Sequence, residues 1–266
     1  MATIHIFVVF AVSCLVSVSG RTLNITELIS YFTHGADVGY RVAIDKCTLN
    51  LPQQVAKYSF GDVIDNARVY FANNNDWWIH FSTRRYVNGS HFNITGPVSR
   101  LTEAFFTDRG EADFNLSDFD GKTGRLLVSG NINCKATQGG VHATTSTNKG
   151  KEITTFADVK ASLGIGFNVR YHVNILKCNP NPQQFTGTVG WAGRISSHRL
   201  NINGDIEFTQ YVELPTATFV MDVTLHKDRN VTLYVDSVVP DTRRSTGLLR
   251  KKCVLGTAGS FHIFKV

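Results

Sequence analysis

Apolar and polar residues alternate in the same order at two distant places in this 266-residue chain. In residues 38–47, VGYRVAIDKC, every second residue from Val38 to Ile44 is apolar or aromatic, and a cysteine follows. Residues 169–178, VRYHVNILKC, repeat that order 131 positions later. An alternation of period two places one set of side chains on the same face of an extended chain. We therefore predict two equivalent strands, each with one buried face.

An amphipathic helix is predicted just ahead of each strand. The first is carried by Ile25, Leu28, Ile29 and Phe32, and the second by Phe156, Val159 and Leu163. Their spacing of three and four residues places these side chains on one helical face. Asn24 and Thr155 stand where a side-chain oxygen accepts from an early backbone amide, with an acid three residues further on. Gly35 is suited to end the first helix.

The similarity extends along the rest of the chain. Alignment of residues 25–47 on 156–178 gives the identical pairs Gly35/Gly166, Val38/Val169, Tyr40/Tyr171, Val42/Val173, Ile44/Ile175, Lys46/Lys177 and Cys47/Cys178. Further on, IHFS at 79–82 matches IEFT at 206–209, and later a Thr-Gly segment precedes a cysteine in each copy. We predict a tandem duplication, with a first repeat over 21–146, a short polar linker over 147–152 and a second repeat over 153–266.

The segments between these landmarks favour strands. Short alternating runs are separated by turn residues such as NNND at 73–76 and NING at 201–204. The predicted strands are 67–72, 77–82, 111–119, 124–130, 205–212, 217–225 and 231–239. The predicted fold class is α+β, predominantly antiparallel β, with each repeat made of an N-terminal helix and a curled sheet or small barrel.

The first twenty residues, MATIHIFVVFAVSCLVSVSG, contain no charged residue and are mostly apolar from Ile4 to Val18. This pattern, followed by small residues, is typical of a cleaved signal peptide. The alternative is an uncleaved anchor, for which the apolar stretch is short. We predict that residues 1–20 are removed and that the protein is secreted to the extracellular space, without a transmembrane segment after cleavage.

Four cysteines remain once Cys14 has left with the signal peptide. An even number in an oxidising compartment favours disulfides over the alternative of four buried thiols. Three pairings are open to four cysteines. The duplication selects the pairing within each repeat, Cys47 with Cys134 and Cys178 with Cys253. Loop-closure entropy then contributes about 4 to 5 kcal/mol for each bond.

Asn-X-Ser/Thr sequences occur five times and match N-glycosylation acceptors, which need exposed turns in a secreted protein. Two of them share the stretch YVNGSHFNIT, whose Asn-Gly pair signals a tight turn. The predicted glycosylation sites are Asn24, Asn88, Asn93, Asn115 and Asn230.

Each repeat thus contains a helix, a glycine, an alternating strand ending in Lys-Cys, a later Ile-x-Phe-Ser-type strand and a second cysteine. This series resembles the VirK family of small secreted bacterial proteins, and the resemblance covers both repeats. It implies an exported, cysteine-containing domain, and the family has no established catalytic residues to transfer to this chain. The tandem arrangement and the glycosylation sequences depart from the single-domain bacterial pattern.

Catalytic and metal-binding signatures are absent from the sequence. It has no P-loop, dinucleotide-binding glycine motif, His-Glu-x-x-His helix, Gly-x-Ser-x-Gly elbow or Cys-x-x-Cys pair. Asp118 and Asp120 have the spacing of a carboxylate pair, but Gly121 beside them favours a loop. His142 and His262 hold equivalent places in the repeats and are interpreted as strand residues. We predict no catalytic residue, no cofactor and no metal site.

Positive charge is concentrated before the last cysteine. The chain has a formal net charge of +6. The predicted anion-binding residues are Arg243, Arg244, Arg250, Lys251 and Lys252. Such a cluster attracts sulfated glycans, acidic extracellular matrix or anionic lipid head groups, and the alternative is a solvated basic loop. The predicted secretion excludes intracellular nucleic acid as a partner.

Three classes of function follow from these patterns. The leading prediction is a secreted, glycosylated, disulfide-bonded binding or extracellular-matrix protein, because two disulfide-bonded repeats come without catalytic motifs. The second is a carrier that holds a small apolar ligand inside a β-barrel. The third is an enzyme with an unfamiliar site.

Overall fold

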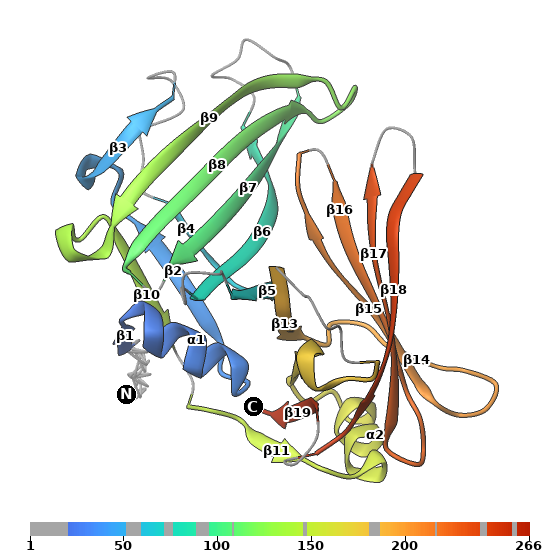
Figure 1. The fold of residues 1–266 in the computed structure, drawn as a ribbon. Coiled ribbons are helices and arrows are strands. Elements are labelled where there is room, and N and C mark those ends of the chain that lie inside the picture. Colours follow the sequence, from blue (N-terminus) through green and yellow to red (C-terminus); the bar gives the residue numbers. More distant parts are fainter. Residues whose placement is uncertain are drawn as a thin grey trace, which may run out of the picture.

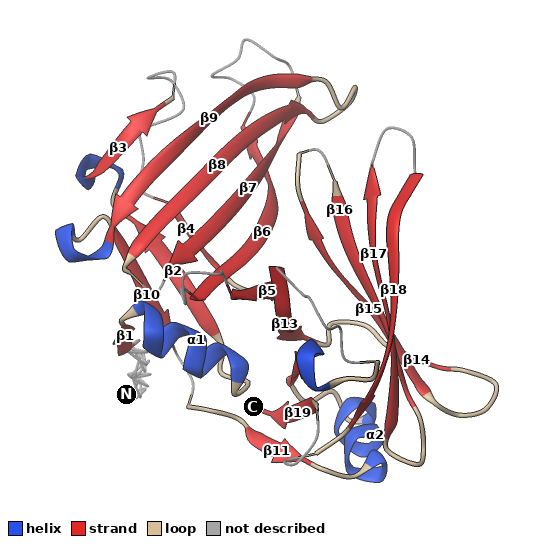
Figure 2. Ribbon diagram, viewed as in Figure 1, coloured by secondary structure: helices blue, strands red, loops and turns tan. Residues whose placement is uncertain are grey.

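The computed structural model describes residues 21–51, 60–71, 77–88, 96–107, 109–145, 148–180, 187–215, 217–239, 244–256 and 260–266. The predicted signal peptide lies outside these residues. Strands dominate the described part of the chain (Figure 2), and neighbouring strands pair antiparallel. The predicted predominance of antiparallel β-structure is therefore confirmed.

The two predicted helices are present as α1 (Ile25–Thr33) and α2 (Phe156–Gly164). Asn24 Oδ1 accepts a hydrogen bond from the Glu27 amide at 2.8 Å, and the Glu27 carboxylate accepts one from the Asn24 amide at 3.1 Å, which completes a capping box. Gly35 follows α1 with a φ of 79°, a left-handed conformation that glycine adopts without steric cost. Neither described helix has the length and apolar character needed to traverse a bilayer.

The strands form three sheets (Figure 1). A four-stranded sheet has the order β1 (Arg21–Leu23), β10 (Val141–Thr145), β2 (Val38–Val42), β4 (Phe60–Val63). A five-stranded sheet has the order β14 (Arg199–Leu200), β15 (Ile206–Glu213), β16 (Thr218–Leu225), β17 (Asn230–Val239), β18 (Arg244–Val254). A ten-stranded sheet has the order β11 (Lys151–Ile153), β19 (Phe261–Lys265), β12 (Val169–Asn174), β13 (Gly187–Arg194), β5 (Asn66–Phe71), β6 (Trp77–Asn88), β7 (Pro97–Thr107), β8 (Glu111–Asp120), β9 (Leu126–Lys135), β3 (Cys47–Asn50).

The strand order is the same in the first half of the chain, residues 21–145, and in the second half, residues 148–266. The order β1-β10-β2-β4 is matched by β11-β19-β12-β13, and the meander from β5 to β9 is matched by the meander from β14 to β18. The registers agree as well, because Gly39 lies opposite Val63 in the first half and Arg170 lies opposite Arg194 in the second.

The two halves are joined in one sheet, which the sequence did not predict. Strand β13 of the second half pairs with β5 of the first, from Gly193 opposite Asn66 to Gly187 opposite Phe71. We call this pairing and the contacts around it the junction. The expectation of a separate sheet for each repeat is wrong here, because edge pairing depends on contacts far apart in sequence. The predicted linker is also shorter than expected, because residues 151 and 152 belong to β11.

Each half nevertheless buries a core of its own. In the first half, Tyr40 packs against Phe81 and Phe106, with ring centroids 5.2 and 5.8 Å away. In the second half, Tyr171 packs against Phe208 and Phe261 at 5.4 and 5.9 Å. The apolar face predicted for the two repeated strands therefore has similar aromatic surroundings in both halves.

Both disulfides expected from the sequence are formed. Cys47 and Cys134 lie opposite each other on β3 and β9, and Cys178 is bonded to Cys253 of β18. Each bond closes a long loop within one half, with sequence separations of 87 and 75 residues.

A buried arginine holds the junction together. Arg170 on β12 has no exposed surface, and its guanidinium donates to Asp37 Oδ1 at 2.5 Å and to the Ile64 carbonyl at 2.9 Å. Its carbon Cζ lies 5.3 Å from the centre of the Phe32 ring. Asn168 Nδ2 donates to the second oxygen of Asp37 at 2.9 Å. Residues of the second half thus bind the loop that follows α1.

Candidate functional site

A cleft of about 620 Å³ lies on the face of β7, β8 and β9 that is turned away from the first core. We call this surface the polar face, and Pro215 of the second half contributes to the edge of the cleft. Figure 1 shows β6–β9 and the five-stranded sheet on either side of the β5–β13 junction. The residues of the cleft used below are Glu103, Asn115, Ser117, Phe119, Ser129 and Asn131.

Strand register arranges the polar side chains of the cleft in rows. Asn131 on β9 lies opposite Asn115 on β8, which lies opposite Glu103 on β7. In the next row, Ser129 lies opposite Ser117. Residues directly opposite one another in a sheet present neighbouring side chains on the same face. These two rows therefore present amides, hydroxyls and one carboxylate to the cleft, beside the apolar side chains of Leu116, Phe119 and Leu126.

The carboxylate of Glu103 belongs to a buried ionic cluster. His80 Nε2 lies 3.0 Å from Glu103 Oε1, and Asn115 Nδ2 donates to Glu103 Oε2 at 3.1 Å. Burial alone raises the pKa of Glu103, but the hydrogen bonds from His80 and Asn115 outweigh it and the pKa is lowered. Burial lowers the pKa of His80. At neutral pH the pair therefore combines a carboxylate with a neutral imidazole.

Arg68 lies beside this pair, at the junction. Its side chain is buried, and burial lowers its pKa to about 9. The guanidinium lies 3.5 Å from the centre of the Phe219 ring on β16 and 4.5 Å from that of Tyr70. A cation placed over an aromatic face is attracted by the ring quadrupole. The second half thus covers the part of the polar face that holds Arg68.

A second contact fixes the two halves along the cleft. Arg84 Nε on β6 donates to Glu213 Oε2 on β15 at 2.9 Å, and the Glu213 amide donates to Ser82 Oγ at 2.9 Å. Arg84 also donates to Ser99 Oγ at 2.8 Å and lies 5.3 Å from the centre of the Phe119 ring. These contacts hold Phe119 and the floor of the cleft in place.

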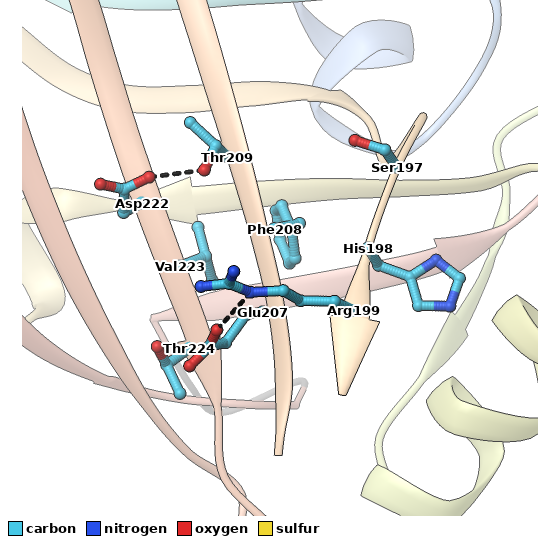
Figure 3. Close-up of a pocket in the computed structure, with 9 residues that line it drawn as sticks. All are labelled: Ser197, His198, Arg199, Glu207, Phe208, Thr209, Asp222, Val223 and Thr224. Carbon is cyan, nitrogen blue, oxygen red and sulfur yellow. Dashed lines mark hydrogen bonds and ion pairs between the residues drawn. The ribbon is translucent and has the colours of Figure 1, made fainter. Parts of the chain in front are cut away.

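The second half carries an exposed counterpart of the ionic cluster, in a pocket of about 510 Å³ (Figure 3). By strand register, Arg199 and Glu207, which lie opposite each other, correspond to Arg68 and His80. In the same way, Asp222 and Thr209 correspond to Glu103 and Ser82. The residues that interact in Figure 3 are Arg199 with Glu207 at 2.8 Å and Thr209 with Asp222 at 2.5 Å. We call this the Arg199 pocket. The first-half counterpart is covered by the junction, whereas this pocket is open.

The predicted anion-binding residues do not share one face. Arg243 lies outside the described residues, and the side chain of Arg244 is not described. Arg250 and Lys252 are exposed on one face of β18, but Lys251 points to the other face, is buried and donates to the Pro180 carbonyl. The alternative of a solvated loop is wrong for Arg244, Arg250, Lys251 and Lys252, because these four belong to β18.

The predicted glycosylation sites fall into three groups. Asn24 and Asn230 are exposed, at the start of α1 and of β17. Asn93 and the side chain of Asn88 lie outside the described part of the chain. Asn115 is half-buried within β8 and hydrogen-bonded to Glu103, so the expected exposed turn is wrong for this site.

The other candidate residues also lie on strands. Asp118 and Asp120 belong to β8, where a loop was expected, and the buried Asp118 carboxylate accepts two hydrogen bonds from Arg100, at 2.7 and 2.8 Å. His142 is exposed on β10, and His262 on β19 lies 2.7 Å from Glu152. Among the described residues, no group of three or more His, Cys, Asp or Glu side chains has the arrangement of a metal site.

Sequence reasoning missed Arg68, His80 and Glu103. Each stands alone within an apolar strand, and no spacing between them marks a site, because β5, β6 and β7 bring them together. The one local signal was the acid in LTEAFF, residues 101–106, a stretch otherwise suited to a buried strand.

The fold and the cleft define a two-part antiparallel β-protein with a polar cleft on one sheet face. No family model matches the chain, and no curated protein matches it. Among solved structures, a VirK family protein from Legionella pneumophila matches with 15% sequence identity and a TM-score of 0.37, over 46% of this chain and 97% of that protein. This is a weak VirK-like resemblance.

Proposed function

We propose that the protein is a secreted binding protein of the extracellular space that binds an uncharged, hydroxyl-rich ligand such as a glycan in the cleft on the polar face. The rows of amide and hydroxyl side chains on the cleft floor carry this proposal. Asn131, Asn115 and Ser117 supply donors and acceptors for sugar hydroxyls. The aromatic ring of Phe119 supplies an apolar surface at the same site.

The charge of the cleft favours an uncharged ligand over a sulfated one. Glu103 has a lowered pKa and is ionised at neutral pH, so it accepts hydrogen bonds and repels sulfate and carboxylate groups. Arg84, the nearby cation, is already paired with Glu213. An anionic matrix partner would instead bind Arg250 and Lys252, which are exposed on one face of β18. Lys251 between them is buried on the other face and does not add to this charge.

The alternative of a small apolar ligand inside a barrel is less favoured. The space between the sheets of each half is occupied by core side chains, among them Phe106 and Phe114 in the first half and Trp191 in the second. The predicted absence of catalysis remains a prediction.

We also infer that the two halves are VirK-like modules derived by duplication. The shared strand order and the equal registers of Gly39–Val63 and Arg170–Arg194 support this origin. The secretion route and glycosylation at the exposed sites, Asn24 and Asn230, belong to the same proposal. An N-glycan on Asn115 would occupy the cleft, so we expect that site to be unmodified in the secreted protein.

A panel of uncharged oligosaccharides, with heparin as the anionic member, tests the cleft. We expect the purified secreted protein to bind at least one uncharged member, and Asn131→Ala to weaken that binding at least tenfold by titration calorimetry. Asn133→Ala is the matched control, because Asn133 is exposed on the same face of β9 and bonded to Asp113. Binding to heparin alone, or equal losses in both variants, would contradict the proposal.

A further inference from the structure

Each half carries a second copy of the surface that the other half uses at the junction, and neither of these copies is paired in the described strands. Within the chain, the end of α1 and the edge of β5 in the first half contact the outer face and the β13 edge of the four strands β11-β19-β12-β13. In the second half, the end of α2 and the edge of β14 correspond to the end of α1 and the edge of β5. In the first half, the edge of β4 corresponds to the edge of β13. In the described strand pairings, β4 pairs with β2 alone and β14 with β15 alone.

The unused surface of the second half is rich in exposed apolar side chains. Ile165 and Phe167 follow α2 and are 71% and 42% exposed. Leu200 on β14 is 48% exposed, and Ile202 just beyond it is fully exposed. Exposed apolar groups at an open strand edge, as Leu200 and Ile202 are, are typical of a surface that binds a partner.

Side-chain sizes at the two ends are complementary. At the junction, the large Phe264 of the second half packs directly against Gly35 after α1, and Arg170 contacts Asp37 and the Phe32 ring. In the first half, the small residues Gly39 and Thr144 stand in the places of Arg170 and Phe264. Gly39 lies opposite Thr144, just as Arg170 lies opposite Phe264.

The residues after α2 include a larger counterpart of Ala36. Phe167 stands where the first half has Ala36, and Ile165 stands where it has His34. At the proposed contact, the large Phe167 therefore faces the small Gly39 and Thr144. A second copy of the chain therefore fits the free end of the first by the same mode of packing.

The strand register of the junction can be transferred to a contact between two copies. At the junction, Gly193 lies opposite Asn66 and Ala192 opposite Ala67. In the contact between copies, Asp62 at the β4 edge of one copy would lie opposite Ser197 of the next, and Gly61 opposite His198. Val63, which is 49% exposed, stands next to Gly39 on the outer face of β4.

We propose that copies of this protein associate head to tail, with β4 of one copy pairing with β14 of the next and with Ile165 and Phe167 packing against Gly39 and Thr144. This contact is heterologous, so each bound copy leaves one end free. It uses neither the cleft nor its ligand and stands or falls separately from the proposed function.

Sedimentation velocity over a range of protein concentrations tests the proposal. We expect a reversible rise of the mean mass beyond that of a dimer. Ile165→Asp blocks one end and Val63→Asp blocks the other, and each is expected to raise the concentration at which half of the protein is associated by at least tenfold. Leu126→Asp is the matched control, because Leu126 is an apolar residue, 51% exposed, at the start of β9, and this variant is expected to associate like the unchanged protein.

Mixing the two blocked variants gives the decisive result. Each retains one working end, so an equimolar mixture is expected to form dimers that grow no further, which also shows that both variants are folded. Three outcomes would overturn the proposal: a mass that remains monomeric at every concentration, a two-fold symmetric dimer that Ile165→Asp abolishes and mixing does not restore, and capture of an unrelated protein at this end without self-association.

Discussion

Replacement of Arg170 by methionine removes the charged contact at the junction while retaining a long side chain. The guanidinium is fully buried, donates to Asp37 and to the Ile64 carbonyl, and lies over the Phe32 ring. Burial lowers the pKa of Arg170, and the Asp37 carboxylate opposes that effect. Methionine fills the space but leaves both acceptors without this donor.

The expected loss is about 3 kcal/mol in the free energy of unfolding. Removing one partner of a buried ion pair costs roughly 3 to 5 kcal/mol. The lower end applies here, because the side chain of Asp37 is 26% exposed and keeps its hydrogen bond from Asn168. Hydrogen bonds that involve a charged group contribute about 1.5 to 3 kcal/mol, which agrees with this value.

Urea unfolding of a double-mutant cycle provides the assay. The cycle combines Arg170→Met with Asp37→Asn, and we expect a coupling energy of at least about 1.5 kcal/mol between them. Arg41→Met is the control, because Arg41 is exposed on β2, and its effect is expected within about 0.5 kcal/mol. A coupling below about 0.5 kcal/mol, with Arg170→Met no worse than the control, would refute the role assigned to this ion pair.

Three further predictions concern the cores and the buried cluster. Replacing Cys178 and Cys253 together by alanine is expected to lower the free energy of unfolding by about 4.5 kcal/mol in urea titration, because the bond closes a loop of 75 residues; an unchanged midpoint would contradict this. Tyr171→Phe is expected to keep or raise the free energy of unfolding, because the buried hydroxyl has no hydrogen-bond partner among the described residues; a loss above about 1 kcal/mol would count against it. Burial lowers the pKa of His80, so the unfolded state binds more protons than the folded state and the free energy of unfolding falls as the pH drops below about 6.5. His80→Gln is expected to make the free energy of unfolding depend less on pH between about pH 6.5 and 5. The same slope in the variant and the unchanged protein would exclude the effect.

The features that the sequence predicts well are those set by residues close in the chain. The spacing from Ile25 to Phe32 predicts a helix with one apolar face, and α1 appears where it was expected. The period of two from Val38 predicts a half-buried strand, which the structure ends at Val42, because residues 44–46 form a short 3₁₀ helix before Cys47. Asn24 and Glu27 specify the first turn of α1 by a local hydrogen-bonding pattern. The disulfide pairing followed because the repeated pattern placed the cysteines at matching positions.

The candidate site was not predictable in this way, because β7 has both of its faces covered. Ser99, Thr102 and Glu103 are buried on this strand together with its apolar residues, so the usual alternation of polar and apolar positions is lost. The strand was missed for that reason, and with it the carboxylate of the cluster. Asp118 lies within the predicted strand 111–119, but the neighbouring Gly121 favoured a loop for the Asp118 and Asp120 pair, and the Asp118 partner Arg100 is on the missed strand.

The Arg170–Asp37 ion pair distinguishes the junction within one chain from the proposed contact between copies. The junction has Arg170 paired with Asp37, whereas the equivalent positions at the free ends are Gly39 and Asn168, which form no ion pair. The contact between copies therefore has no counterpart of the Arg170–Asp37 ion pair. The two halves of one chain are therefore held together by a buried ion pair, and the proposed contact between copies relies on apolar packing and strand pairing. Association between copies is accordingly expected to be the weaker of the two and to depend on concentration, while the junction remains intact.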